Sequence, residues 1–210
     1  MHTADWARFA HEWRQTYYHF TRTLAANPSA APYKTVDEHH LSSLRELLHA
    51  WQLEGLWTDA EVDELSLVWH RLDPWPDTVA GLRALNTRFA TCTLSNGNVA
   101  LLTDMAEHAR LEWTHVFSAE MFKSYKPDPA VYLGAARKLG LEPGQCAMVA
   151  AHLNDLKAAK QCGFRTVYVK RRQEEALDPD KERQEGYVDV WVEEHEAGFL
   201  AVAERLGVSM

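Results

Sequence analysis

The sequence lacks the features that mark a secreted or membrane-spanning protein. Cysteines number only 3 in 210 residues. Cys92, Cys146 and Cys162 lie in apolar or helical contexts, which favours buried free thiols over a disulfide framework. No apolar run is long enough to cross a bilayer, and the first residues resemble neither a signal peptide nor a transit peptide. We therefore expect a cytoplasmic protein without a membrane partner.

Positive charge is scarce as well. Lys and Arg number 22 against 30 Asp and Glu, which gives a net charge of −8. This balance argues against nucleic acid or an anionic membrane surface as a partner. The composition, with 46% apolar and 25% charged residues, is otherwise typical of a globular protein. A chain of 210 residues is long enough for a core domain and a smaller one.

Strand-like alternation is missing from the first third of the chain. Apolar residues recur there at helical spacing, at Trp6, Phe9, Ala10, Trp13, Tyr17 and Phe20. Arg14 lies on the shoulder of this apolar stripe. Two further helices are each predicted by a capping box, formed by Thr35 with Glu38 and by Thr58 with Glu61. The opening segment is therefore expected to be entirely helical.

The character of the sequence changes at Pro74 and Pro76, which forbid a continuous helix and mark a linker. Beyond them, strand patterns alternate with helix patterns, as in a parallel sheet with helices on both faces. The chain is thus predicted to be an α/β protein with two parts. Residues 1–72 would form a helical cap, and residues 73–210 an α/β core.

The core pattern predicts an ordered series of elements. Helices are expected over 78–85, 99–110, 129–139, 155–162 and 197–206, and strands over 89–94, 116–117, 146–150, 166–169 and 188–192. Asn98 is placed to cap the helix that follows it. The segment 171–186 is dense in charges of both signs, which predicts a solvated loop rather than a binding element.

Polar residues follow three of the predicted strands or precede the next helix. Ser95 and Asn96 end one strand, Lys126 comes just before a helix, and His152 and Asp155 follow another strand. Ligands of an open α/β sheet bind at the carboxyl ends of its strands. Each residue also has a structural alternative, as a turn residue, a helix cap or a surface charge. Together with Arg14, they favour a site for a small anion.

Three of these segments resemble ordered motifs of the haloacid dehalogenase superfamily: Thr-Leu-Ser-Asn-Gly at 93–97, Tyr-Lys-Pro-Asp at 125–128 and Met-Val-Ala-Ala-His-Leu-Asn-Asp at 148–155. The branch that they resemble most is the type II L-2-haloacid dehalogenases. The resemblance implies a Rossmannoid parallel sheet with an N-terminal helical cap. It also implies hydrolytic removal of halide from a small 2-haloalkanoic acid.

The resemblance also implies roles for the residues that bind the substrate. Arg14 matches the family's cap arginine, which clamps the substrate carboxylate or receives the leaving halide. Ser95 and its backbone neighbours would hold the carboxylate, and Asn96 would line the halide cradle. Tyr132 matches an active-site tyrosine of the family. The implied partner is therefore a small anionic carboxylate.

Catalytic roles follow from the same likeness. In the family an Asp carboxylate attacks C2 of the substrate, and water then hydrolyses the ester. Lys126 would keep that carboxylate ionised and oriented, and Asp155 with His152 would position or deprotonate the water. Ala151 stands where related phosphatases have an acidic ligand for Mg²⁺, and Ala150 offers no ligand either. We therefore expect no metal and no cofactor, with a Mg²⁺-dependent phosphatase as a distant alternative.

The family's first motif, a strand followed by Asp-x-x-x-Thr, is not found in the sequence. Asp5, ahead of Arg14, stands at a helix start and does not match the nucleophile. The resemblance thus predicts that the first central strand is missing between the strands ending at Leu94 and beginning at Cys146. Those two strands would expose unpaired edges unless they pair directly or another chain or segment fills the slot.

Three interpretations remain open for a chain without this motif. It is a dehalogenase-like hydrolase by descent, a non-catalytic protein that dimerises and retains the anion pocket, or a truncated form of an active enzyme. Exposed strand edges and a Trp-rich cap also favour a homodimer.

Overall fold

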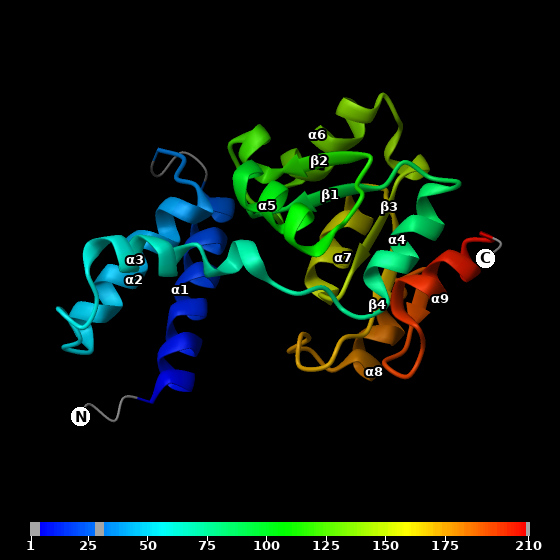
Figure 1. The fold of residues 1–210 in the computed structure, drawn as a ribbon. Helices are drawn as coiled ribbons and strands as arrows, with labels where there is room; N and C mark the ends of the chain where they lie inside the picture. Colours follow the sequence, from blue (N-terminus) through cyan, green and yellow to red (C-terminus); the bar gives the residue numbers. More distant parts are fainter. Residues whose placement is uncertain (1–4, 28–31, 209–210) are drawn as a thin grey trace.

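The computed structural model describes residues 5–27 and 32–208. Helices from the N-terminal part gather on one side, and an extended linker connects them to an α/β body (Figure 1). The N-terminal helices are α1 (Trp6–Ala26), α2 (Val36–Ala50), α3 (Asp59–Ser66) and the 3₁₀ turn η1 (Val68–Arg71). Both predicted capping boxes are confirmed, at the starts of α2 and α3.

The predicted alternation of helices and strands after the linker is confirmed. Its helices are α4 (Thr78–Asn86), α5 (Val99–Ala109), α6 (Pro129–Leu139), α7 (Leu153–Gln161), α8 (Pro179–Glu182) and α9 (Gly198–Arg205), with 3₁₀ turns η2 (Ala119–Phe122), η3 (Pro143–Gln145) and η4 (Arg183–Glu185). Its strands are β1 (Cys92–Ser95), β2 (His115–Ser118), β3 (Ala147–Ala150), β4 (Arg165–Val169) and β5 (Val190–Val192).

The strands are parallel, and helices cover both faces of the larger sheet. Alternate side chains of β4 face opposite layers. Tyr168 packs into a cluster with Leu156 of α7, whereas Val167 and Val169 pack with Val202 of α9. The predicted edge strand is confirmed, because β5 pairs with β4.

The sheet is divided into two pieces, β1-β2 and β3-β4-β5. In the part of the chain that the structure describes, β1 pairs only with β2, so our alternative of direct pairing between β1 and β3 is wrong. Leu94 of β1 packs against the cluster that contains Met148 of β3. The two strands therefore share a core through side chains while their backbones stay apart.

The two strands that border this division, β1 and β3, are less buried than β4. All four residues of β1 are only half-buried, whereas Thr166 to Val169 of β4 are buried. Ala147, at the start of β3, is exposed. Strands in the middle of a parallel sheet are normally buried on both faces. The exposure of β1 is thus a direct consequence of its having a single neighbour among the described residues.

Two local predictions need correction. Asn98 precedes α5 but does not cap it with its side chain. The first amide of α5, on Val99, instead donates to Glu120 Oε2 at 2.9 Å. The side chain of Asn98 contacts the cap, donating to Asp37 Oδ2 at 2.6 Å. The three thiols are free, as expected, but half-buried rather than buried.

A buried imidazole reinforces this contact between cap and core. His70 of η1 has a side chain only 7% exposed, with Nε2 3.0 Å from Asp37 Oδ1 and Nδ1 2.7 Å from Asp104 Oδ2. Asp37 belongs to α2 and Asp104 to α5. Because one ring joins three elements, it fixes how the cap helices sit against the core.

The cap also contains two histidines that resist protonation. Burial lowers the pKa of both His39 and His40 to about 4, from an ordinary value of 6.5. As pH falls below 6.5, the unfolded chain takes up protons that the folded cap excludes. We predict that the free energy of unfolding declines between pH 6.5 and about 4 and that His40→Gln flattens this decline. Urea titrations followed by tryptophan fluorescence measure both.

His19→Gln is the matched control for this pH dependence. His19 lies on the exposed side of α1, and its replacement should leave the wild-type decline intact. If the free energy of unfolding declined equally in the wild-type protein and in His40→Gln, the decline could not be attributed to the lowered pKa of His40.

Candidate active site

The centre of the candidate site is the carboxylate of Asp155, in the first turn of α7. Lys126 Nζ donates to Asp155 Oδ2 at 2.6 Å, and the Tyr132 hydroxyl donates to Oδ1 at 2.6 Å. The side chains of Lys126 and Asp155 are each only 15% exposed. Partial burial makes these charge-assisted bonds stronger than surface pairs. The alternatives of a simple surface lysine and a simple helix cap are therefore excluded.

Tyr132 acts as a fixed donor in this cluster. Burial raises the pKa of its hydroxyl, and the negative charge of Asp155 raises it further. Tyr132 lies on the first turns of α6, where Asp128 caps the helix by accepting the Ala130 amide at 2.8 Å. The proton therefore stays on Tyr132, pointing at Asp155 Oδ1.

Asn96 links the end of β1 to Lys126. Its Oδ1 accepts the Lys126 backbone N–H at 2.8 Å, and its Nδ2 donates to the Lys126 carbonyl at 3.4 Å. Ser95 is half-buried beside it, and its Oγ accepts the Gly97 amide at 3.1 Å. Ser95 thus closes the turn, and its own hydroxyl proton is left for another acceptor.

The cap contributes a tyrosine that the sequence did not single out as a site residue. Burial raises the pKa of Tyr17 to about 12, an effect that the Asn96 side chain partly offsets and the charge of Asp155 increases. Tyr17 also packs against the buried cluster that contains Leu101 and Tyr125, so its ring reaches from the cap into the core. The spacing of Tyr17 in the apolar stripe predicted burial against other helices. Nothing in that spacing distinguishes packing from a place in the site.

Arg14 lies next to Tyr17 along α1. Its guanidinium donates to the Tyr18 hydroxyl, from Nε at 3.3 Å and from Nη2 at 3.0 Å. Nη2 also lies 3.3 Å from Glu174 Oε2. Arg14 therefore pairs with a carboxylate, the structural alternative that we had considered, while it remains 43% exposed.

The prediction that segment 171–186 is a solvated loop is wrong at its start, where the Arg171 side chain is only 12% exposed and pairs with Asp77, and at two positions that reach into the site. Glu174 Oε2 lies 3.5 Å from His152 Nε2 as well as near Arg14, and these contacts lower the pKa of Glu174. Glu175 Oε2 accepts the Leu153 amide at the start of α7 at 2.5 Å. The high density of charges in this segment gave no sign of which ones contact the site.

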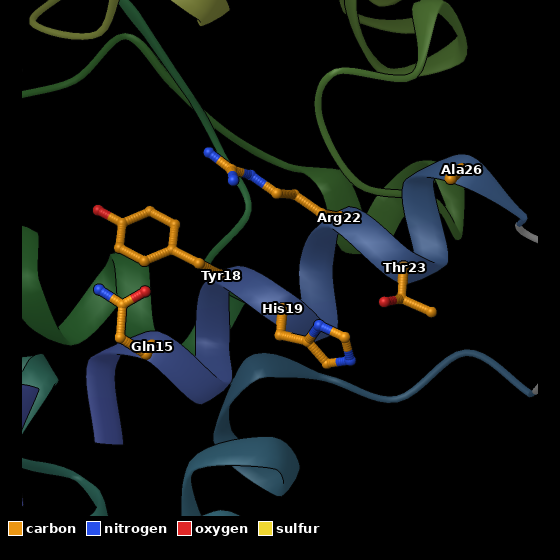
Figure 2. Close-up of a pocket in the computed structure, with 6 residues that line it drawn as sticks. All are labelled: Gln15, Tyr18, His19, Arg22, Thr23 and Ala26. Atoms are coloured by element: carbon orange, nitrogen blue, oxygen red, sulfur yellow. The ribbon is translucent and has the colours of Figure 1, made fainter. Parts of the chain in front are cut away.

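A shallow hollow lies along one face of α1. It has a volume of about 440 Å³ and is lined by Gln15, Tyr18, His19, Arg22, Thr23 and Ala26 (Figure 2). Because all of its lining comes from a single helix, it is a surface depression rather than an enclosed pocket. The centroid of the Tyr18 ring lies 5.6 Å from the Arg14 guanidinium and 5.8 Å from that of Arg22.

Among the described residues, no three His, Cys, Asp or Glu side chains are arranged to hold a metal ion. Asp155, the acidic residue of the third motif, uses both carboxylate oxygens on Lys126 and Tyr132. None of the helices in these ranges is long and apolar enough to cross a membrane.

Solved structures define the class of this fold. The chain is similar to an L-2-haloacid dehalogenase at 35% identity and a TM-score of 0.80, with 93% of this chain and 83% of that one covered. It is similar to a defluorinating L-2-haloacid dehalogenase at 32% identity and a TM-score of 0.84, with 97% and 81% covered. The fold is thus that of a capped α/β hydrolase. The chain belongs to the haloacid dehalogenase-like hydrolase family, whose model matches residues 4–163.

Curated relatives agree with this assignment. An (S)-2-haloacid dehalogenase 4A from Burkholderia cepacia is 32% identical over 162 residues, 76% of this chain and 67% of that protein. An (S)-2-haloacid dehalogenase 1 from Pseudomonas sp. (strain CBS-3) is 35% identical over 106 residues, 49% of this chain and 47% of that protein. The chain therefore matches 67% of the length of the first relative and 47% of that of the second.

The contact between Lys126 and Asp155 can be measured by a double-mutant cycle. Removing either partner alone leaves a partly buried charge unpaired, so Lys126→Gln and Asp155→Asn should each destabilise the protein. The double variant should be more stable than the sum predicts, with a coupling of about 1–3 kcal/mol. Chemical denaturation gives the four free energies.

The control cycle uses the same residue types at an exposed site. Lys181 and Asp178 lie 3.4 Å apart with side chains 83% and 49% exposed. Their coupling should be close to zero, because solvent screens exposed pairs. Equal coupling at the two sites would show that Lys126 and Asp155 gain nothing from their surroundings.

Proposed function

We propose that this chain forms the cap and core of a hydrolytic 2-haloacid dehalogenase that acts on small 2-haloalkanoic acids. The observation that carries the proposal is the cluster of Lys126, Tyr132 and Asp155 at the strand ends, with Arg14 of the cap nearby. The proposed domain division is a cap over residues 1–72 and a core over 73–210. We further propose that the protein is cytoplasmic and that it forms a homodimer. The homodimer is supported by exposed apolar side chains such as Trp6 at 47% and Leu56 at 50%.

In this proposal Arg14 holds the substrate carboxylate, because a guanidinium matches two carboxylate oxygens in one plane. Tyr18 supports that role by accepting from Nε and Nη2, which fixes the plane of the guanidinium. Ser95 has a hydroxyl proton available for the same carboxylate. Asn96 lines the halide position with the Tyr17 hydroxyl near it.

We propose that the attacking carboxylate is carried by a strand that fills the slot between β1 and β3. Three features support this. Each flanking strand belongs to a parallel sheet, and β1 is half-exposed along its length. The bridge from Asn96 through Lys126 to Asp155 crosses the carboxyl end of the slot. Lys126 would there serve two carboxylates and keep the attacking one ionised.

The proposed reaction has two steps. A carboxylate oxygen attacks C2, the C–halogen bond breaks, and halide leaves with the bonding electrons while C2 inverts. Water then adds to the carbonyl carbon of the ester and transfers a proton to Asp155, assisted by His152. Cleavage of the acyl–oxygen bond, with transfer of the proton from Asp155 to the leaving oxygen, releases the 2-hydroxy acid; the second proton of the water is lost to solvent, which restores the carboxylate.

A non-catalytic ligand-binding protein is the second candidate. The observation that favours it concerns Asp5, the aspartate that precedes Arg14 in the chain. Asp5 lies in an exposed position, where its Oδ1 caps α1 by accepting the Arg8 amide at 3.0 Å. That carboxylate cannot serve the site. In this case the pocket would bind a small carboxylate without turning it over.

Halide release from L-2-chloropropionate tests the proposal. We predict no release above background from the 210-residue chain. Extension ahead of Met1 by a strand that ends in Asp-x-x-x-Thr should produce release, and replacing that Asp by Asn should reduce the rate by at least about 10³-fold. An ion-selective electrode follows chloride directly.

The Asn version of the extended chain is the matched control, since it keeps the strand and removes only the charge. Turnover by the unextended chain would contradict the proposed source of the nucleophile. Binding of the substrate by the extended Asp version with no release would favour the ligand-binding candidate.

A further inference from the structure

One carboxylate oxygen in the loop after β4 contacts both the cap and the core. Glu174 Oε2 lies 3.3 Å from Arg14 Nη2 and 3.5 Å from His152 Nε2. It thus lies between Arg14 of the cap and His152 at the start of α7. No pattern in the sequence predicted a carboxylate from this loop at that position.

We infer that Glu174 is a specificity-determining residue, an internal carboxylate that occupies Arg14 and must be displaced by the carboxylate of the substrate. The inference rests on the proposed function, which assigns Arg14 to the substrate carboxylate. Glu174 Oε2 takes Nη2 of Arg14, so a substrate carboxylate that pairs with the fork of the guanidinium in one plane must displace it. Glu174 therefore lowers the affinity of the site for carboxylates and leaves its affinity for neutral ligands unchanged.

The surroundings of Glu174 allow this exchange. The pair with Arg14 is partly solvated, with side chains 43% and 29% exposed, and such pairs contribute little stability. Tyr18 holds the Arg14 guanidinium by two separate contacts. Arg14 therefore keeps its orientation when Glu174 leaves. His152 remains beside Glu174 as a partner for the displaced carboxylate.

The backbone does not need to move. Glu175, the next residue, is anchored by both oxygens, which accept the Leu153 amide at 2.5 Å and the Leu177 amide at 2.8 Å. The loop is thus attached to the start of α7. Rotation of the Glu174 side chain alone exposes Arg14, so the exchange is confined to one residue.

Binding measurements on the chain as it stands test the inference without any need for turnover. L-2-chloropropionate is titrated into the wild-type protein, Glu174→Gln, Arg14→Ala and Glu185→Gln, with ligand-observed NMR as the readout. Glu174→Gln should lower Kd by about two- to fivefold, the range expected for release of a partly exposed ion pair. Binding of L-2-chloropropionamide, which has no carboxylate, should be unchanged.

Glu185→Gln is the matched control, because it removes one negative charge from the same segment at an exposed position. Its Kd should equal that of the wild type. An unchanged or raised Kd in Glu174→Gln, while Arg14→Ala weakens binding, would overturn the inference and leave the proposed function intact. An unchanged Kd in Arg14→Ala would overturn the proposed function itself.

Discussion

The polar bridge from Asn96 through Lys126 to Asp155 is the interaction on which the rest of the site depends. It joins the end of β1 to the start of α7 across the place where the sheet is divided. Two partly buried charges are costly unless they are paired and hydrogen-bonded, and Tyr132 completes the pairing. The bridge therefore holds the two pieces of the sheet in one core and places a lysine at the end of the slot between them.

Two of the contacts that attach the cap to the core lie at different places and differ in burial, and this makes a site between cap and core possible. Away from the site, the imidazole of His70 joins Asp37 to Asp104. At the site, Arg14 reaches Glu174 of the core loop. The first attachment is buried and the second is partly solvated. This difference allows the residues around Arg14 to exchange partners while the cap keeps its position.

Local signals in the sequence predicted the elements well, and long-range pairings were the part that they could not supply. The helix Pro129–Leu139 was predicted with the bounds that the structure has, because Asp128 caps it, proline suits its first turn and Gly140 ends it. Asn98 was assigned to its own helix, but its partner Asp37 lies 61 residues away. Glu174 and Arg14 are separated by 160 residues, and no spacing rule connects them. The three motifs were found because their residues lie at strand ends, where the fold brings them together.

The proposed place of the attacking carboxylate depends on the free edges of β1 and β3. Amide hydrogen exchange measures these edges most directly, because an unpaired amide exchanges much faster than one in a ladder. We predict that the amides of β1 and β3 that do not pair with β2 or β4 exchange at least about tenfold faster than those in the middle of β4. Equal protection across β1, β3 and β4 would mean that the slot is already closed, and it would contradict the proposal.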